Sequence, residues 1–389
     1  MPDIGVARRG ADSVFGFLRR TADETADGVS WRSLSYQNEA IRRHDLWDGV
    51  PGVALFLADY AAITGSAEAS ELARRVLAWS VAQARIAPSP DPPGPNLGRG
   101  AAGMSLAYLH LARIDTAALD RAAELAAQVA EAPPAQNPSL LWGTAGEIVL
   151  LLRVWEATHE EAFRSAAMRR GAMLGDETLP GVLAAVAQRP IPLGLAPGLA
   201  GIGIALAALH AADSGGAGSA SIRHVADALL TRGRADDLTA DGLAWPTRTD
   251  ADAPLGYQWC IGTPGVGLFF AAAAAALDDA DLRATALAAG ETTYAHGDAK
   301  QNLSLCHGLS GSAELLIELY RLTREARWLE RATEFAERAF AYCTTSPEGD
   351  IWPADEPGLV APNLSTGAAG VGRLFLQLLA PDKTRALFL

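Results

Sequence analysis

The sequence has few cysteines. Only three occur in its 389 residues, namely Cys260, Cys306 and Cys343. Two of them stand in matching sequence contexts, so the three thiols do not make the even-numbered framework of a small disulfide-rich secreted protein. The first twenty residues also carry scattered charges and lack the apolar core of a signal peptide. These absences favour a cytoplasmic location.

The sequence also lacks a surplus of basic residues and an apolar run of membrane-spanning length. Lys and Arg number 32 against 45 Asp and Glu, which gives a formal net charge of -13. Because binding to nucleic-acid phosphates needs clustered Lys and Arg, we do not expect nucleic acid as a partner. The apolar run at 266–277 is too short to cross a bilayer, so we expect no membrane insertion.

What the sequence does contain is an internal repeat. A G-x-x-G followed by an apolar run recurs seven times. The glycine pairs are Gly49/Gly52, Gly100/Gly103, Gly143/Gly146, Gly198/Gly201, Gly262/Gly265, Gly308/Gly311 and Gly367/Gly370. Nearly continuous apolarity after each pair predicts buried inner helices. These cover residues 53–57, 104–111, 148–152, 202–209, 266–277, 313–319 and 371–379.

Amphipathic stretches lie between the apolar runs and predict outer helices that are apolar on one face only. They are residues 69–85, 117–131, 160–173, 220–232, 279–293 and 324–342, and residues 10–27 can supply a seventh. Matched inner and outer layers close naturally into a ring. We therefore predict an all-α fold, an α/α toroid of seven inner and seven outer helices. An open solenoid is the alternative, but it needs polar caps at its ends.

The same pattern predicts the domain organisation. We interpret residues 1–389 as one toroidal domain, in which residues 1–45 supply the outer helix that closes the ring. If all inner helices point the same way, their N-terminal ends gather at one mouth. The residues just before each G-x-x-G then line that mouth, and equivalent residues of successive repeats lie side by side.

Potential metal ligands occur in two successive repeats. Cys260 and Cys306 each stand two residues before the first glycine, and His307 follows Cys306. Two thiolates and an imidazole are borderline-soft ligands that suit zinc. Three protein ligands leave a fourth position open, which is typical of catalytic rather than structural zinc sites. The sequence therefore predicts one Zn²⁺ held by Cys260, Cys306 and His307.

With these residues in view, the chain resembles the lanthionine synthetase C-like family, the lanthipeptide cyclases, over essentially its whole length. Residues 45–57, beginning D-L-W-D-G, resemble the first-repeat motif of the family. W-C-x-G-x-P-G at 259–265 and C-H-G at 306–308 resemble its two zinc motifs. The resemblance implies the toroidal fold and the three zinc ligands Cys260, Cys306 and His307.

The resemblance also implies a reaction. In the family, zinc binds a cysteine thiol of a dehydrated precursor peptide and lowers the pKa of that thiol. The sulfur then adds to dehydroalanine or dehydrobutyrine and closes a (methyl)lanthionine thioether ring in a ribosomal peptide natural product. The chain has no kinase, lyase or dehydratase region, so we expect separate proteins to dehydrate the peptide.

The chain departs from the family pattern around the metal. The histidine before the G-x-x-G of repeat four is replaced by Pro197, and the tyrosine after the first zinc cysteine by Ile261. An aspartate of repeat three is replaced by Ser139, and an arginine before the first zinc cysteine by Gly256. The ligand set is intact, while the acid–base groups beside it are substituted.

Another group must therefore protonate the α-carbon during cyclisation. Tyr257, three residues before Cys260, is our candidate catalytic residue, and His44, Asp48, His296 or water are the alternatives. Asp48 fits a role as cap of the first inner helix equally well. Arg99 is a candidate for binding a peptide carboxylate, or for pairing with a neighbouring helix.

Two other functions remain open at this point. A zinc-dependent thiol transferase would join a small thiol such as glutathione to an acceptor. A catalytically altered partner protein would keep zinc for stability and bind the precursor peptide within a biosynthetic complex. Substitution of the acid–base residues favours the second alternative more than the zinc ligands alone would.

Overall fold

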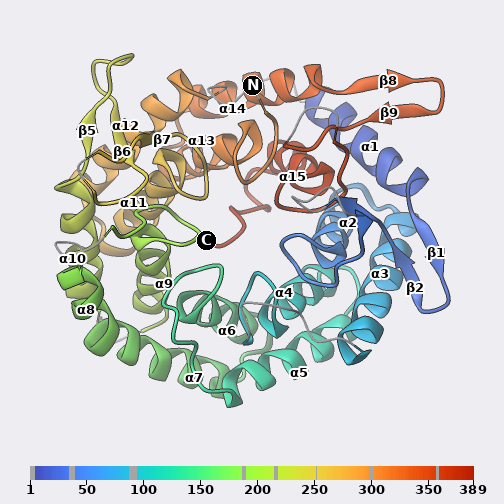
Figure 1. Ribbon diagram of the computed structural model, residues 1–389, viewed down its shortest axis with the longest axis horizontal. Helices are drawn as coiled ribbons and strands as arrows, with labels where there is room; N and C mark the ends of the chain where they lie inside the picture. The colour runs from blue at the N-terminus through green and yellow to red at the C-terminus, as the bar shows by residue number, and fades with distance from the viewer. Residues whose placement is uncertain are drawn as a thin grey trace.

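Two concentric layers of helices close into a ring (Figure 1). The computed structural model describes residues 5–34, 40–86, 94–185, 190–213, 218–250, 252–297, 302–355 and 359–389. Within these residues, the inner layer consists of α2 (Val50–Thr64), α4 (Ala101–Ala112), α6 (Thr144–Thr158), α9 (Leu199–Ala212), α11 (Thr263–Leu277), α13 (Leu309–Thr323) and α15 (Ala368–Leu379). The outer layer consists of α1 (Gly5–Arg20), α3 (Ala67–Ile86), α5 (Ala117–Glu131), α7 (Glu161–Ala172), α10 (Ser219–Leu230), α12 (Ala280–Ala295) and α14 (Ala326–Ala341). Over the described ranges, the predicted toroid of seven inner and seven outer helices is confirmed.

The burial of side chains follows the predicted layers. In the inner helix α11, the consecutive residues Leu268, Phe269 and Phe270 are all buried, because one face meets the outer layer and the others meet neighbouring inner helices. The outer helix α14 instead buries Trp328, Ala332 and Phe335, which are spaced by four and three residues on one face. The difference in periodicity between the two layers thus reflects how many sides of each helix are covered.

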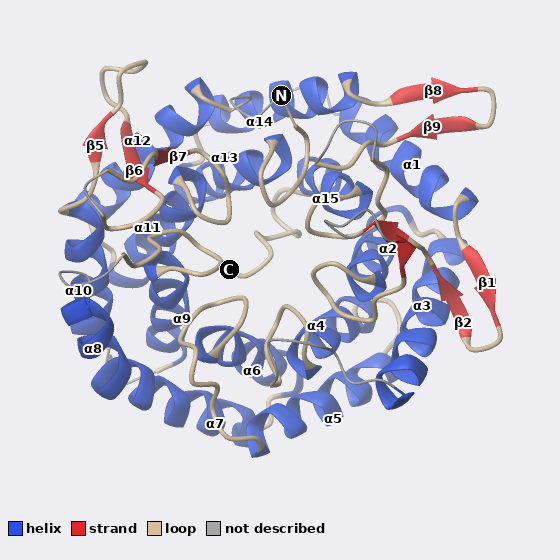
Figure 2. Ribbon diagram, viewed as in Figure 1, coloured by secondary structure: helices blue, strands red, loops and turns tan. Residues whose placement is uncertain are grey.

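Short strands lie at the rim of the ring (Figure 2). Two-stranded antiparallel ribbons are formed by β1 (Asp23–Thr25) with β2 (Gly28–Ser30), β3 (Ser33–Leu34) with β4 (Ala40–Ile41), and β8 (Thr344–Ser346) with β9 (Gly349–Ile351). β5 (Arg234–Ala235), β6 (Leu243–Pro246) and β7 (Leu255–Gly256) form a three-stranded sheet. A π-helical turn, η1 (Met173–Thr178), and α8 (Leu179–Ala185) extend the outer layer after α7.

The N-terminal helix differs from the predicted range of 10–27. α1 begins at Gly5 and ends at Arg20, and the β1–β2 hairpin follows it. Gly28 has a φ of 141°, a conformation that side chains disfavour, so Asp27-Gly28 turns the chain back instead of continuing the helix. α1 packs against α15 and α14, and thereby covers the last inner helix.

The loops that precede the inner helices form a closed ring of backbone hydrogen bonds. In each repeat, the ring residue is the one that stands two positions before the first glycine of the G-x-x-G. Its backbone N–H donates to the backbone carbonyl oxygen of the equivalent residue in the next repeat. The bonds are Trp47 to Gly98 (3.1 Å), Gly98 to Leu141 (2.8 Å), Leu141 to Ala196 (3.2 Å), Ala196 to Cys260 (2.9 Å), Cys260 to Cys306 (3.3 Å), Cys306 to Ser365 (2.9 Å) and Ser365 to Trp47 (3.1 Å). Since hydrogen-bonded strands lie about 5 Å apart, the ring is roughly 11 Å across.

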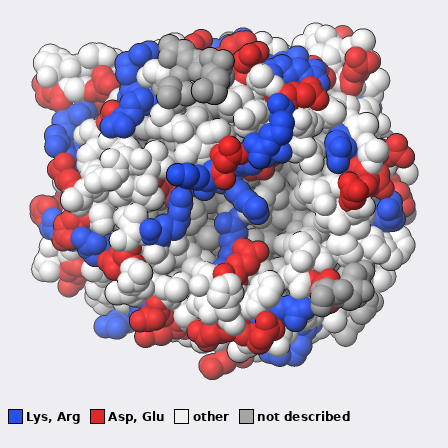
Figure 3. Space-filling view, turned by 180° about the vertical axis from the view of Figure 1, so that it is seen from behind, with Lys and Arg blue, Asp and Glu red and all other residues white. Residues whose placement is uncertain are grey.

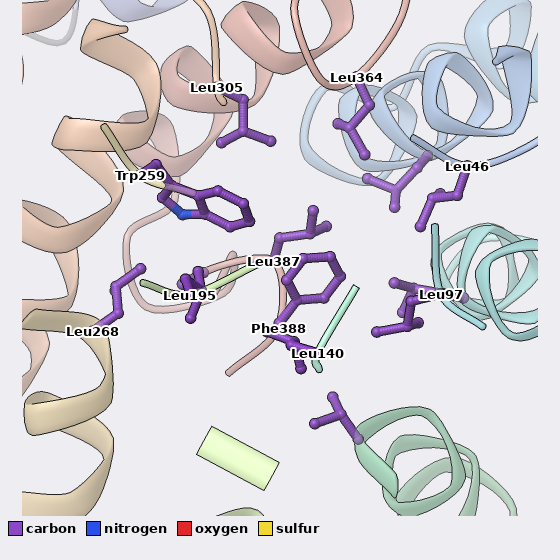
Figure 4. Close-up of a cluster of buried hydrophobic side chains, with 14 of the residues drawn as sticks. Leu46, Leu97, Leu140, Leu195, Trp259, Leu268, Leu305, Leu364, Leu387 and Phe388 are labelled. Atoms are coloured by element: carbon purple, nitrogen blue, oxygen red, sulfur yellow. The ribbon is translucent and has the colours of Figure 1, made fainter. Parts of the chain in front are cut away.

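A layer of apolar side chains lies directly beneath this ring (Figure 4). The residue before each ring position contributes one buried side chain, namely Leu46, Leu97, Leu140, Leu195, Trp259, Leu305 and Leu364. Leu387 and Phe388 from the C-terminal segment lie among them. The second glycine of the G-x-x-G permits this packing: a Cβ at Gly103 would lie 2.1 Å from the Leu97 carbonyl oxygen and 2.7 Å from Leu46 Cβ.

A buried ion pair joins the first and last inner helices. Arg373 of α15 donates to Asp59 of α2 over 2.8 Å, and both side chains are at most 1% exposed. Asp59 also hydrogen-bonds to His110 and Arg113 at the end of α4.

Among the described residues, no helix has the length and apolarity needed to cross a membrane.

Candidate metal centre

The structure brings Cys260, Cys306 and His307 together. The Sγ atoms of the two cysteines and a ring nitrogen of His307 all lie within 4.8 Å of one another. Cys260 and Cys306 are neighbours in the hydrogen-bonded ring, so their equivalent positions in successive repeats determine this proximity. Cys260 is 7% and Cys306 6% exposed, while the His307 side chain is 26% exposed. The cluster is therefore buried on the cysteine side and open on the histidine side.

Asp355 orients the imidazole of His307. Its Oδ2 hydrogen-bonds to Nδ1 of His307, and its Oδ1 accepts from the Ser304 hydroxyl. The same hydroxyl oxygen accepts the backbone N–H of His307 over 3.1 Å. Because Nδ1 hydrogen-bonds to Asp355, Nε2 is the nitrogen left to bind a metal ion, and it would lose its proton on doing so, as in the carboxylate–histidine pairs of zinc sites.

The electrostatics of the cluster suit a cation. A hydrogen bond with Cys306, helped by His307, lowers the pKa of Cys260 to about 5 although burial opposes this. The pKa of Cys306 is raised, because its bond to Cys260, burial and nearby negative charge all disfavour a second thiolate. Burial lowers the pKa of His307, but Asp355 and Cys260 outweigh it and raise the pKa to about 10. A divalent cation would remove the obstacle to a second thiolate, so the S₂N donor set fits zinc.

An ion pair occupies another part of the mouth. Asp48 accepts from the Ser365 hydroxyl over 2.9 Å and from Arg99 Nη2 over 3.2 Å. The guanidinium of Arg99 lies 5.2 Å from the centre of the Trp142 ring. The Asp48 and Arg99 side chains are 22% and 24% exposed, and the charge of Asp48 contributes to the raised pKa of Cys306. A fixed cation and anion thus lie in the same mouth as the thiols.

Tyr257 belongs to a second cluster. Its ring stacks on His296 at a centroid distance of 4.1 Å and an angle of 9°. His296 Nε2 lies 2.7 Å from Asp236 Oδ1. Burial, followed by Asp236 and Asp237, raises the pKa of Tyr257, so its phenol retains its proton. Tyr257 therefore contacts His296 and lies in the field of Asp236 and Asp237.

The remaining sequence candidates lie close to the ring but outside the ligand cluster. Burial lowers the pKa of His44, so its imidazole is uncharged at neutral pH. Ser139 is buried, and within the described residues its Oγ has no hydrogen-bond partner. Gly256 packs so tightly that a Cβ there would lie 2.9 Å from Gly262 Cα, which excludes the arginine side chain expected from the family pattern.

Sequence reasoning missed Asp355. It lies between β9 and α15, 48 residues from the histidine that it holds. The equivalent position, three residues after Trp245 in the similar β5–β6 hairpin, is Arg248, so the repeat pattern does not mark a carboxylate here. The adjacent Trp352-Pro353 indicates an ordered loop but does not show where that loop lies.

Three of the proteins to which the chain is similar bear on its fold and family. A zebrafish (Danio rerio) protein named glutathione S-transferase LANCL1 is 33% identical over 128 residues, which is 33% of this chain and 30% of the relative, so the match spans about a third of either protein. A solved nisin cyclase superimposes with a TM-score of 0.66 at 18% identity, over 96% of this chain and 93% of the other. A cellobiose 2-epimerase from Bacillus thermoamylovorans gives a TM-score of 0.50 at 9% identity, over 97% and 98% of the two chains. At such identities the structural likenesses describe the fold alone.

A family model decides the assignment. It describes lanthionine synthetase C-like proteins and matches residues 40–389, which include all seven G-x-x-G repeats and the Cys260, Cys306 and His307 cluster. The chain belongs to the lanthionine synthetase C-like protein family.

Proposed function

We propose that the protein is a zinc-dependent cyclase that forms thioether rings in a dehydrated ribosomal peptide. The observation that carries the proposal is the cluster of Cys260, Cys306 and His307 at the open mouth of the toroid. Its three donors leave a coordination position for a thiol, and Asp355 fixes the imidazole in the tautomer that ligation requires.

The proposed chemistry uses groups of this chain together with solvent water. Bound by Cys260, Cys306 and His307, zinc would supply a Lewis acid that favours the thiolate form of a peptide cysteine. The sulfur adds to the β-carbon of a dehydroamino acid, and the electron pair moves to the adjacent carbonyl oxygen. The α-carbon then takes a proton from Tyr257 or from water, while the thiol proton leaves to solvent. Among these groups, the Tyr257 phenol retains its proton near neutral pH because its pKa is raised.

The Asp48–Arg99 pair supplies a fixed hydrogen-bond donor in the mouth. Asp48 and Trp142 hold the guanidinium of Arg99 from two sides. A guanidinium held in this way suits a carbonyl or carboxylate oxygen of the peptide. We propose that Arg99 binds the peptide in the mouth. Separate kinase/lyase or dehydratase proteins would dehydrate the precursor, and the reaction would take place in the cytoplasm.

Two alternatives have specific support. The partial match to a protein named glutathione S-transferase favours a small thiol as the donor, with joining of two molecules in place of ring closure. Pro197 and Ile261, where the family carries acid–base groups, favour a partner protein that binds the precursor without reacting.

One experiment separates these three functions. A dehydrated peptide with a single cysteine is incubated with the zinc-loaded protein, with and without glutathione, and the products are analysed by mass spectrometry after thiol alkylation. Ring closure leaves no alkylatable thiol and supports the cyclase. A glutathione adduct supports the transferase. Unchanged peptide that nevertheless co-elutes with the protein supports the binding partner and contradicts the proposed activity.

A further inference from the structure

A second group of potential metal ligands lies at the rim of the ring, where the loop between β5 and β6 meets the end of α12 (Figure 2). Asp236 and Asp237 begin this loop, and His296 follows the last residue of α12. One carboxylate oxygen of each aspartate and a ring nitrogen of His296 all lie within 4.8 Å of one another. Two ligands of a single ion, bonded at roughly 2.0–2.6 Å, are at most about 5 Å apart, so one ion can reach all three.

Asp236 is held so that one of its oxygens faces His296. Its Oδ2 accepts the backbone N–H groups of Leu238 (3.2 Å) and Thr239 (3.0 Å), together with the Thr239 hydroxyl. Its Oδ1 lies 2.7 Å from Nε2 of His296. The side chain of Asp236 has no exposed surface, and that of His296 is 13% exposed. A buried carboxylate and an imidazole are therefore already aimed at one point, and a metal ion would take the place of the proton between them.

Thr292 adds a buried oxygen to the same place. It is fully buried, and among the described residues its Oγ1 has no hydrogen-bond partner. Thr292 stands one helical turn before His296 and so lies on the same face of α12. Its hydroxyl points to the loop that holds Asp236: a Cβ built on Gly242 would lie 2.6 Å from Thr292 Oγ1 and 2.9 Å from Asp236 Cβ. Because an unpaired buried hydroxyl is costly, an ion at this point, or a water molecule bound to that ion, would stabilise it.

The negative charge of this group is not balanced by Lys or Arg. Elsewhere opposite charges lie close together, as Figure 3 shows around the hollow of the face behind that of Figure 1. In the part of the chain that the structure describes, no Lys or Arg lies within ion-pair distance of Asp236 or Asp237. Burial, followed by the charges of Asp236 and Asp237, raises the pKa of the neighbouring Tyr257. The group thus has a surplus of negative charge that a divalent cation would neutralise.

The donor atoms indicate which kind of ion fits. Carboxylate oxygens suit hard cations such as Mn²⁺, and an imidazole suits first-row transition metals. We propose that Asp236, Asp237 and His296 form a second metal site, which binds one hard divalent cation, with Mn²⁺ as the best fit. This site holds its ion more weakly than two thiolates hold zinc, so it fills when metal is added and does not alter the zinc content expected of the purified protein.

The second metal site is separate from the thiol cluster, because none of its ligands belongs to the group of Cys260, Cys306 and His307. Binding at the second site therefore does not depend on the proposed cyclase reaction. The site does adjoin Tyr257, whose ring stacks on His296. A bound dication offsets the two carboxylate charges beside that phenol, and this effect alone rests on the proposed function of Tyr257 as the acid.

Titration of the full-length protein with Mn²⁺, followed by electron paramagnetic resonance, tests the proposal. The spectrum of the free ion broadens on binding, so the loss of signal counts the bound ions. We expect one bound Mn²⁺ per chain, with nitrogen coupling from the His296 ring in pulsed spectra. Cys306→Ala should bind Mn²⁺ as the wild type does. Absence of binding by the wild type at millimolar Mn²⁺, or loss of binding in Cys306→Ala, would overturn the proposal.

Three further variants locate the ion. Asp237→Asn and His296→Gln each remove one ligand. Since loss of a group that merely supports a ligand already lowers metal affinity about 10–100-fold, each should weaken Mn²⁺ binding at least about tenfold. Asp241→Asn removes an exposed carboxylate from the same loop and is the matched control, with an expected change of less than about threefold. Circular dichroism checks the fold of each variant. Equal affinities of Asp237→Asn and Asp241→Asn, or bound Mn²⁺ without nitrogen coupling, would contradict the assigned ligands.

Discussion

The backbone N–H of Ser365 donates a 3.1 Å hydrogen bond to the carbonyl oxygen of Trp47. This bond joins the seventh repeat to the first and closes the ring. The carbonyl oxygen of Ser365 also accepts the N–H of Cys306, so a proposed metal ligand is one hydrogen bond away from the closure. The geometry of the candidate metal centre therefore depends on the circular arrangement and not on two adjacent repeats alone.

Asp59→Asn should destabilise the ring. Burial alone would raise the pKa of Asp59, but His110, Arg373 and Arg113 outweigh it and lower the pKa to about 2. Because the folded-state pKa is depressed, the stabilisation is present above the unfolded-state value near 4 and is lost as pH falls towards 2. We expect the free energy of unfolding to fall by about 3–5 kcal/mol at pH 7, because the substitution breaks a buried ion pair, and to fall by less at pH 3.

Urea unfolding at the two pH values measures this effect. Glu325→Gln, which breaks the exposed pair with Arg327, is the control and should change stability by less than about 1 kcal/mol. An equal decrease in the free energy of unfolding for the two variants at pH 7 would show that the Asp59 ion pairs do not stabilise the contact between the first and last inner helices.

The zinc content should depend on two of the three cysteines. We expect one zinc per chain in the wild type and none in a Cys260→Ala, Cys306→Ala double variant, because a single imidazole cannot hold the ion. Cys343→Ala should retain the full content, since Cys343 lies outside the cluster. Elemental analysis of the purified proteins decides the matter, and stoichiometric zinc in the double variant would refute the ligand assignment.

Asp355→Asn should weaken zinc binding without removing any ligand. Loss of the carboxylate that holds His307 typically lowers metal affinity about 10–100-fold. Competition with a chromophoric chelator measures the affinity, and circular dichroism checks the fold. Asp382→Asn, at an exposed position, is the control. An unchanged affinity in Asp355→Asn would mean that the observed contact has no role in ligation.

Tyr257→Phe should slow ring closure and leave the zinc content unchanged. The raised pKa keeps the wild-type phenol protonated, so it remains a proton donor across the neutral range. Loss of a general acid usually lowers the rate about 10²–10⁴-fold. Tyr294→Phe, which removes a hydroxyl bonded to Glu334 in the outer layer, is the control. A wild-type rate in Tyr257→Phe would assign the proton transfer to water or to another group.

The repeat pattern was sufficient to predict the ring and the ligand cluster. Each inner helix is apolar on nearly all sides, so an uninterrupted apolar run in the sequence marks where it lies. In a closed ring, equivalent positions of successive repeats are neighbours. This is why Cys260 and Cys306 could be paired across 46 residues of sequence. The Asp27-Gly28 turn is visible in the sequence, and it explains why α1 ends before the predicted boundary at residue 27.

Contacts that break the repeat could not be predicted. Asp355 reaches His307 from the loop after β9, and the equivalent position after the tryptophan of β6 is Arg248, so the repeats give no second carboxylate as a guide. Tyr257 and His296 stack because a rim sheet and the end of α12 meet, which depends on tertiary packing. Phe388 lies at the centre of the apolar layer although its short segment has no periodic pattern.

The most direct test of the proposed function is the rate of thioether formation. A dehydrated cysteine-containing peptide is followed by mass spectrometry at several pH values with wild type, Cys306→Ala and Cys343→Ala, alongside the peptide alone. We predict that wild type and Cys343→Ala accelerate ring closure over the uncatalysed rate, and that Cys306→Ala does not. Equal rates for wild type and Cys306→Ala would contradict a cyclase that depends on this metal centre.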